Sequence, residues 1–461
     1  MPPNEGTTAR PAHHEIRKPE STANVQTGTA YKYIGKPTPR HDGIAQVTGT
    51  NAYVDDIRLP GMLTVKVLRA PVLKANLLNV DVSGAARVRG VAAVISAKDV
   101  PGNFYGMYGD QPVLADREIR YKGQVIAAVA AADPDVALEA VEQIKLDLEE
   151  LPPVLDPEEA MKPDAPKVRP EGNLWSFDGG PFRKVRLGNI DKGFAEADHI
   201  VEGVYTTPMQ EQSPMETSCS LAMLESGVQL VIHSLSQSPY LHLRQLSNVL
   251  KLPMNKMRLV GGNTGGAFGG RFEMHTDHVA GLLALKTRKP VKWRWNREEE
   301  TLYSTHRGRW KFYFKDGVKK DGRIVARYVR TIHDTGAYTG MGPYCVEKNA
   351  MMVAGPYHIP NIAIDGYCAY TNRTPSGAMR GFGVMAGQVC EEIQMHRIAE
   401  LLGMDPWEIR FINAWREGDM TATGKVVDNV AAIECMQAVA KLAGIDLPER
   451  LKAMSSREKR S

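Results

Sequence analysis

A glycine-rich stretch at residues 257–271 constrains the fold of this chain more than any other part of the sequence. Six of the eleven residues from 261 to 271 are glycine, and the aromatic Phe268 lies among them. Glycine has no Cβ, so it permits positive φ and close approach of backbone N–H groups to a bulky ligand. An apolar run precedes the stretch and a helical pattern follows at residues 275–286, which predicts a strand, a turn and a helix. A turn that leads into a helix N-terminus suits an anion such as a phosphate.

Two other interpretations of this stretch stay open. Many glycine-rich turns serve only to form a tight corner, which is the structural alternative. A pyrophosphate-binding loop of a nucleotide-dependent oxidoreductase is the alternative from another enzyme class. The stretch lacks both the Gly-Lys-Ser/Thr ending of a P-loop and the Gly-x-Gly-x-x-Gly spacing of dinucleotide-binding folds, which argues against nucleotides.

Composition and charge indicate an ordinary globular protein. The chain has 461 residues, enough for two or three domains, and it is 43% hydrophobic and 24% charged. Its 57 basic residues nearly balance 53 acidic ones, which gives no support to binding of nucleic acid or an anionic membrane. No apolar run approaches the roughly 20 residues that span a bilayer. Residues 1–32 are polar and are predicted to form a disordered or wrapping arm.

The five cysteines do not form a recognisable set. They are scattered, odd in number and never in a Cys-x-x-Cys pair. This pattern speaks against a disulfide framework, a zinc site or a [2Fe–2S] centre in this chain, and we expect a reduced, cytoplasmic setting.

The hydrophobic patterns predict two domains joined by a linker. Residues 33–153 predict an α/β unit, with strands at 63–68, 91–95 and 124–131, a helix after Asp133-Pro134 and a half-exposed strand at 144–148. Residues 154–184 are proline-rich and predict a linker. A second domain follows at 185–445, with a helix capped by Asp405 and a last one capped by Asp428, and residues 446–461 predict a charged tail.

Three stretches of the second domain form a specific combination: Gln-Glu-Gln-Ser-Pro-Met-Glu-Thr-Ser-Cys-Ser-Leu-Ala (residues 210–222), Gly-Gly-Ala-Phe-Gly-Gly-Arg (265–271) and Thr-Asn-Arg-Thr-Pro-Ser-Gly-Ala-Met-Arg-Gly-Phe-Gly (371–383). In this order, and with Tyr-His-Ile-Pro-Asn (357–361) before the third, they resemble the molybdopterin-binding large subunits of the xanthine dehydrogenase and aldehyde oxidase family. Residues 53–57, 59–63, 98–102 and 151–154 are similar to the α/β-hammerhead domain of that family. The resemblance covers roughly residues 33–445.

The resemblance implies an α+β fold, an α/β-hammerhead domain followed by the first half of a molybdopterin-binding domain. It also implies a molybdenum hydroxylase, which inserts an oxygen atom from water into a C–H bond of an N-heterocyclic or aromatic substrate, or of an aldehyde. In this family the metal is held by the dithiolene of a pterin and has no direct protein ligand. The cofactor carries the chemistry, and the protein binds and orients it.

The resemblance assigns cofactor-binding roles to four residues. Gln210 matches a glutamine that donates a hydrogen bond to the apical oxo group, and a neutral NH₂ suits that acceptor. Phe268 and Gly269 match the loop backbone that packs against the metal centre. Arg380 matches an arginine beside the anionic pterin–metal group. Outside their motifs, Gln210 would more simply be a buried structural residue and Arg380 a surface charge.

Three further residues are assigned to the substrate pocket. Phe382 matches an aromatic that faces the substrate, with core packing as its alternative. Where xanthine-oxidising members carry a glutamate after the basic residue of the loop, this chain has Phe272; where they carry an arginine, it has Lys348. Losing both partners argues against purine oxidation, because such sites discriminate through these hydrogen bonds. Lys348 would instead meet a carboxylate or carbonyl, or remain solvated.

The largest departure concerns the rest of the family pattern. The second half of the molybdopterin domain, with its Met-Gly-Gln-Gly loop and its Gly-Glu-Pro general base, has no counterpart in this sequence. Glu216 and Glu273 lie near the motifs, but neither matches the base, so no catalytic residue is expected in this chain. Either a partner chain supplies the other half, as in an arrangement similar to nicotinate dehydrogenase, or the chain is a truncated relic. A non-catalytic scaffold subunit is the non-enzymatic alternative.

The expected cofactor and partners follow from the resemblance. The cofactor is molybdenum–molybdopterin in its cytosine dinucleotide form, shared with a second molybdopterin-binding chain. Electrons must leave the metal, and this chain has no cysteine set for a relay, so we expect [2Fe–2S] on an iron–sulfur subunit and FAD on a flavin subunit.

Overall fold

A computed structural model of the chain describes residues 31–226 and 229–458. Most of the predicted arm at residues 1–32 therefore lies outside the described residues. The chain divides after Ala52 into two units. The described part of the first unit contains α1 (Gly43–Thr48), which buries none of its residues. The second unit, from Tyr53 onward, contains the sheets and cores described below.

A seven-stranded sheet combines strands from both halves of the sequence, in the order β13-β12-β11-β14-β1-β7-β3. Parallel pairing of Leu63 with Val291 and of Thr64 with Lys292 joins the two sets. The two sequence domains therefore share one sheet. The strands are β1 (Leu63–Arg69), β3 (Val91–Ser96), β7 (Val125–Ala131), β11 (Cys219–Glu225), β12 (Gln229–Ser234), β13 (Met257–Gly261) and β14 (Val291–Arg294).

Helices cover both faces of this sheet. Ala128 and Ala130 of β7 belong to the core that contains α6 (Pro239–Leu250) and α7 (Asp277–Thr287). Their neighbours Ala127 and Val129 belong to the core under α3 (Pro134–Glu142). Because successive strand residues point to opposite faces, α3 lies on one face and α6 and α7 on the other. The Asp133 cap predicted for α3 is present, since its carboxylate accepts from the N–H of Asp135.

Two small sheets complete the amino-terminal part. Their strand orders are β6-β2-β8 and β4-β5. In β8, Leu146 and Leu148 pack against a small core whereas Lys145 and Asp147 are exposed, which confirms the half-exposed strand predicted there. The elements are β2 (Ala75–Asp81), α2 (Ser83–Arg87), β4 (Phe104–Tyr105), β5 (Gln111–Pro112), β6 (Glu118–Ile119) and β8 (Lys145–Glu150).

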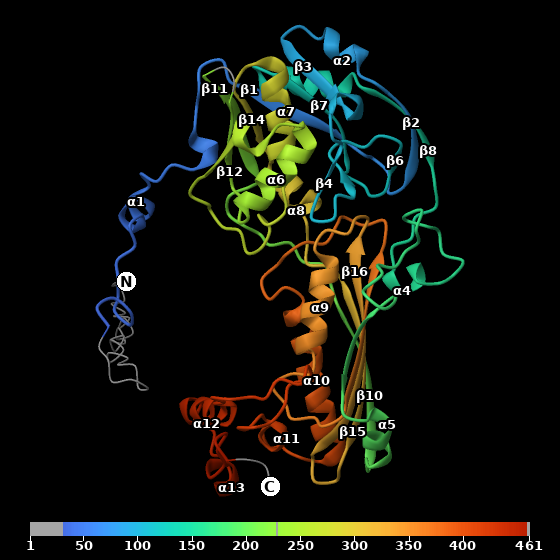
Figure 1. Ribbon diagram of the computed structural model, residues 1–461, viewed down its shortest axis with the longest axis vertical. Helices are drawn as coiled ribbons and strands as arrows, with labels where there is room; N and C mark the ends of the chain where they lie inside the picture. Colours follow the sequence, from blue (N-terminus) through green and yellow to red (C-terminus); the bar gives the residue numbers. More distant parts are fainter. Residues whose placement is uncertain (1–30, 227–228, 459–461) are drawn as a thin grey trace, which may run out of the picture. The chain divides into compact units, whose positions relative to one another are not determined.

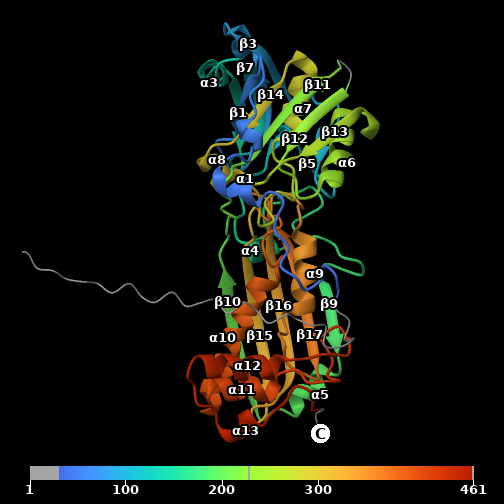
Figure 2. The ribbon, with the colours of Figure 1, turned by 90° about the vertical axis from the view of Figure 1, so that its left-hand side faces the viewer.

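A five-stranded sheet in the order β10-β15-β16-β17-β9 forms the second large layer (Figure 2). Arg327 of β16 points toward α10, where it pairs with Glu391, whereas its neighbour Ala326 packs against Gly193 of α5. Helices α10 and α5 therefore cover opposite faces of this sheet (Figure 1). The strands are β9 (Arg183–Leu187), β10 (His199–Thr207), β15 (Trp310–Val318), β16 (Ile324–Gly336) and β17 (Ile362–Tyr370).

The other helices of the described chain are α4 (Pro157–Ala160), α5 (Ile190–Ala195), α8 (Arg297–Tyr303), α9 (Gly342–Met352), α10 (Val384–Leu402), α11 (Pro406–Asn413), α12 (Ala432–Leu442) and α13 (Glu449–Lys452). Helices α4, α5, α9 and α10 contact strands of the second sheet, whereas α8 lies against the first sheet, where Glu299 pairs with Arg69 of β1. The Asp405 cap of α11 is confirmed. The cap predicted at Asp428 is wrong, because α12 begins at Ala432 after Ala431, which has no side chain that could cap it. Leu447 and Leu451 are buried with Phe411, so part of the charged tail packs.

The proline-rich segment 154–184 follows the second sheet closely. The backbone N–H of Trp175 donates to Cys368, and the N–H of Tyr370 donates to Asn173, each over 2.9 Å. The side-chain oxygen of Asn372 accepts from the N–H of Val154. The segment is thus hydrogen-bonded along β17.

The described residues contain no helix that combines the length and the apolar character of a membrane span.

Candidate cofactor site

The glycine-rich segment forms the predicted turn between a strand and a helix. β13 ends at Gly261 and α7 begins at Asp277. Gly269 has a φ of 106°, and a Cβ at this position would lie 2.4 Å from the carbonyl oxygen of Ala378. A Cβ on Gly265 would lie 2.7 Å from the Cβ of Glu216. Both glycines are required because other segments occupy the space of a side chain.

The three sequence motifs meet at this turn. The N–H of Gly265 donates to Oε2 of Glu216 over 2.6 Å, and the N–H of Glu216 donates back to the Gly265 carbonyl over 3.0 Å. The side-chain amide of Gln212 donates to the carbonyl of Ala378 over 2.8 Å. Hydrogen bonds therefore connect segments 210–222, 265–271 and 371–383, which are far apart in the sequence.

The predicted cofactor-binding residues lie along one continuous path. Gln210 and Arg307 exchange backbone hydrogen bonds over 3.3 and 2.9 Å. The guanidinium of Arg307 donates to the carbonyl of Arg380 over 2.6 Å, and the N–H of Arg380 donates to the carbonyl of Phe268 over 2.9 Å. The side chains of Gln210, Phe268 and Arg380 are exposed, so they are free to contact a bound group.

Arg307 is a site residue that the sequence analysis missed. Its Nε and Nη1 are buried without a hydrogen-bond partner in the described part of the chain, and burial lowers the pKa of its guanidinium. Oε1 of Gln212 and Oε1 of Glu216 are also buried and unpartnered there. Unpartnered N–H donors on a cation suit an anionic group, so Arg307 fits an anionic cofactor such as molybdopterin. The two oxygen atoms are acceptors and suit N–H groups instead. Tertiary contacts with Gln210 and Arg380 place Arg307 here, and no local motif signals it.

The predicted substrate residues lie on three segments: Phe272 after the glycine loop, Phe382 within the third motif and Lys348 on α9. Phe272 is half-buried, and its N–H donates to the Gly269 carbonyl over 2.9 Å. Phe382 is half-buried with a φ of 47° and packs against the core of the second sheet. Lys348 is exposed on α9, next to Asn349, which donates to the carbonyl of Gly383 over 3.0 Å. The structure thus places Lys348 on a helix that contacts the third motif.

A buried ion pair stabilises the end of the glycine loop. Nη1 of Arg271 lies 2.7 Å from Oε1 of Glu300, and the two side chains are 3% and 1% exposed. The same guanidinium donates to Oγ of Ser218 and to the carbonyl of Glu216. Burial acts to raise the pKa of Glu300, but the charge of Arg271 outweighs it and leaves that pKa below its usual value. In the sequence Arg271 is only the last residue of a motif, and no local pattern marks Glu300 as its partner.

Glu273 is an unusual carboxyl beside the loop. Burial raises its pKa to about 7, against weaker hydrogen bonds such as that from Thr305, whose Oγ1 lies 3.4 Å from Oε2. Oε1 of Glu273 has no partner among the described residues. Nearby, burial lowers the pKa of His275 to about 3, so that ring is neutral. At neutral pH Glu273 is thus divided between its charged and neutral forms.

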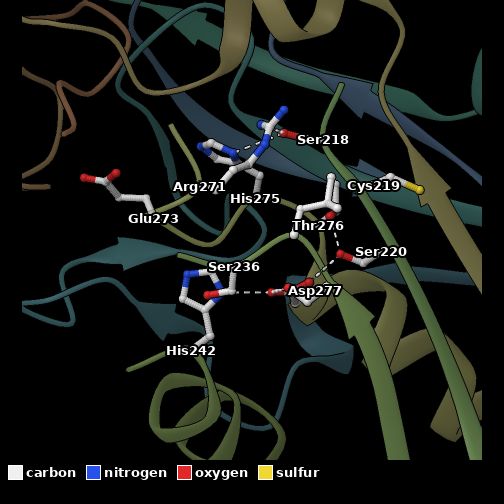
Figure 3. Close-up of a pocket in the computed structure, with 12 residues that line it drawn as sticks. Ser218, Cys219, Ser220, Ser236, His242, Arg271, Glu273, His275, Thr276 and Asp277 are labelled. Atoms are coloured by element: carbon white, nitrogen blue, oxygen red, sulfur yellow. Dashed lines mark hydrogen bonds and ion pairs between the residues drawn. The ribbon is translucent and has the colours of Figure 1, made fainter. Parts of the chain in front are cut away.

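A polar cluster lines a small cavity of about 20 Å³ beside the loop (Figure 3). Asp277 lies at its centre, and His242 contacts both Asp277 and the carbonyl of Phe272. The carboxylate of Glu273 points away from Asp277 in this view. Among the described residues, no group of His, Cys, Asp and Glu side chains has an arrangement that could hold a metal ion.

Two family models match the chain. The molybdopterin cofactor-binding domain matches residues 176–414, and the α/β hammerhead domain of aldehyde oxidase and xanthine dehydrogenase matches residues 48–152. The chain belongs to the aldehyde oxidase and xanthine dehydrogenase family. The family and the fold predicted from the motifs are thereby confirmed, and the chain is a molybdopterin-binding part of a molybdenum oxidoreductase.

The relatives that this chain matches differ in length. The nicotinate dehydrogenase large molybdopterin subunit of Eubacterium barkeri is 35% identical, over 89% of this chain and 96% of the relative. A probable xanthine dehydrogenase component of Bacillus subtilis is 34% identical, over 88% of this chain and 55% of the relative. The aldehyde oxidoreductase structure from Desulfovibrio gigas superposes with a TM-score of 0.84 and 30% identity, over 88% of this chain and 46% of that one. This chain thus spans about half the length of the latter two proteins.

Proposed function

We propose that this chain forms one wall of the molybdenum–pterin site of a multi-subunit hydroxylase that acts on N-heterocyclic or aromatic compounds. The observation that carries the proposal is the meeting of the three motifs around glycines whose missing side chains leave space for close packing. When bound, a molybdenum–pterin cofactor supplies the oxidation of a C–H bond with oxygen from water. The roles of the chain's own residues follow from their positions.

In this proposal some cofactor-binding residues act by hydrogen bonding and packing, and others by their positive charge. The exposed amide of Gln210 donates a hydrogen bond to the cofactor, and the backbone at Phe268 and Gly269 packs against it. Arg380 and Arg307 place two cationic side chains along the same path, which suits an anionic group. Positively charged N–H donors also suit the phosphates of the cytosine dinucleotide form, which we propose for this cofactor.

The residues proposed to contact the substrate are two aromatic side chains and one cationic side chain. Phe272 and Phe382 present rings that pack against a planar heterocycle, and such packing favours aromatic substrates. Lys348 is exposed and suits a carboxylate on that ring. The similarity to a nicotinate dehydrogenase subunit supports an N-heterocyclic carboxylate as the substrate class. An aldehyde is the second candidate, supported by the likeness to aldehyde oxidoreductase.

A second molybdopterin-binding chain closes the site in this proposal. The three cofactor-binding side chains are exposed, and α10 begins directly after the third motif. Along α10, Met385, Val389 and Ile393 recur every four residues and are 50%, 53% and 45% exposed, so they form one apolar row. We assign this row to the second chain. An iron–sulfur subunit and a flavin subunit accept the electrons.

The test compares two glutamines in the purified assembly. Replacing Gln210 with alanine removes the proposed donor, whereas replacing the exposed Gln143, on the end of α3, is the control. We expect Gln210→Ala to lower turnover of nicotinate about 100-fold or more, with molybdenum content and turnover unchanged in Gln143→Ala. Unchanged turnover in Gln210→Ala would favour a scaffold subunit. A native assembly that contains no molybdenum or pterin would refute the proposal.

A further inference from the structure

A buried polar cluster beneath the glycine loop has no part in the proposed chemistry. His242 of α6 and Asp277 of α7 have side chains that are 3% and 4% exposed. Nδ1 of His242 lies 3.0 Å from Oδ2 of Asp277, and both side chains are labelled in Figure 3. Nε2 lies 3.0 Å from the carbonyl oxygen of Phe272. The ring thus connects the first turn of α7 to the exit of the loop.

Both ring nitrogens of His242 face oxygen atoms. A backbone carbonyl accepts hydrogen bonds and never donates them, so Nε2 carries a proton. Nδ1 also carries one if Asp277 is ionised, which makes the ring an imidazolium. Burial acts to lower the pKa of His242, but the contact with Asp277 outweighs it and raises that pKa above its usual value. The charge of the ring therefore depends on the state of Asp277.

Three donors around Asp277 favour its ionised form. Oγ of Ser220 donates to Oδ1, and Oγ of Ser234 donates to Oδ2 over 2.9 Å, in addition to His242. Asp277 also lies in the first turn of α7, where the helix dipole favours a negative charge. Burial acts to raise the pKa of Asp277, yet these contacts, led by His242, leave it below its usual value.

The cluster is not a hydrolase triad. In a Ser-His-Asp triad a serine contacts the histidine nitrogen remote from the carboxylate. Here the carbonyl of Phe272 occupies that nitrogen, and Ser220 and Ser234 donate to the carboxylate instead. The arrangement therefore fits a clamp between two chain segments.

The titratable groups around His242 and Asp277 do not oppose the charged form of this pair. From the loop, Glu273 favours the charged ring, and Arg271 is engaged with Glu300. Burial lowers the pKa of His275 to about 3 and that of His278, on α7, to about 4, so both are neutral. Of the charged side chains around the ring, Arg271 is paired with Glu300, and Asp277 is paired with His242 itself.

We propose that His242 is a charged positioning residue that clamps the exit of the glycine loop to α7. Through the Phe272 carbonyl it fixes the direction in which the Phe272 ring leaves the loop. The clamp is inferred from contacts within this chain, whereas the contact of the Phe272 ring with a substrate rests on the function proposed above. Loss of the clamp loosens residues 269–276 without removing any group that contacts the cofactor.

The protonation of the ring provides the first test. Nitrogen-15 NMR of histidine-labelled full-length chain, with the His242 signals assigned by comparison with His242→Gln, reports on each ring nitrogen separately. We expect both nitrogens of His242 to be protonated at pH 7, where an ordinary histidine, with a pKa of about 6.5, is mostly neutral. A ring that is neutral at pH 7 overturns the proposal.

Loop mobility provides the second test, in the assembled protein. Hydrogen exchange of residues 269–276 should speed up about tenfold in His242→Gln and in Asp277→Asn, which keeps the side-chain volume. His233→Gln, on the neighbouring strand β12, is the matched control and should leave exchange unchanged. Unchanged exchange in Asp277→Asn overturns the clamp. A protonated ring in an assembly that lacks molybdenum would instead keep the clamp and refute the proposed function.

Discussion

At the scale of single residues, Glu273 links pH to stability. Its pKa rises from 4.5 to about 7 on folding, because burial disfavours the charged form. The folded protein therefore binds the Glu273 proton more tightly than the unfolded chain does. This tighter binding stabilises the fold fully below about pH 4.5, and the stabilisation is lost as pH rises through 7. Between pH 5 and pH 8 the free energy of unfolding of the parent protein should therefore fall by about 2–3 kcal/mol through Glu273. In Glu273→Gln this fall should be absent.

Urea unfolding at these two pH values checks the effect of Glu273. The exposed Glu159 supplies the control, since its replacement by glutamine should leave the pH dependence as in the parent protein. Equal pH dependence in Glu273→Gln and the parent would contradict the prediction.

Arg271 and Glu300 illustrate a different residue-level effect. Both are almost fully buried and compensate each other's charge. Arg271→Ala leaves the carboxylate of Glu300 unpaired, so we expect a loss of about 3–5 kcal/mol in the free energy of unfolding. Thermal and urea unfolding measure it. Since the pair needs ionised Glu300, whose pKa is lowered, its contribution is present at neutral pH and is lost in acid. A loss below about 1 kcal/mol would show that the pair is not a stabilising contact.

At the scale of elements, the glycine turn is specified by what packs against it. Gly269 combines a φ of 106° with a Cβ position 2.4 Å from the Ala378 carbonyl. Gly269→Ala should therefore push the third motif away, lower stability by at least about 2 kcal/mol and reduce molybdenum content. In Gly262→Ala the nearest atom, on Val54, lies 3.5 Å away, so this control should be tolerated. Equal molybdenum content in the two variants would contradict the proposed packing.

Most elements of the fold were predictable from local patterns, for clear reasons. The runs that became β1, β7 and β15 are apolar or alternate with period two, and α3 and α11 carry Asp caps before a first-turn proline. The cap at Asp428 was wrong because α12 starts four residues later, where Oγ of Ser456, remote in the sequence, accepts from the N–H of Ile433. Local propensity sets element type more firmly than element ends.

At the scale of the whole molecule, association with a partner is the main prediction. Val389→Glu places a charge in the middle of the apolar row on α10, where it would be buried against the second chain. We expect it to weaken association about tenfold or more, measured by copurification and by molybdenum per chain. Leu138→Glu on α3, a residue 48% exposed, is the matched control and should leave association unchanged. Loss of association in both variants, or in neither, would contradict the assignment of the α10 row.

The sequence by itself determined the family, the order of elements and the motif residues, because glycine spacing, caps and alternation are local properties of the chain. Tertiary structure alone decided that β1 pairs with β14 and that Arg307 lies between Gln210 and Arg380. It also decided that His242 and Asp277 form a buried pair. These contacts join residues remote in the chain, and their energy depends on burial and on partners that no local pattern records.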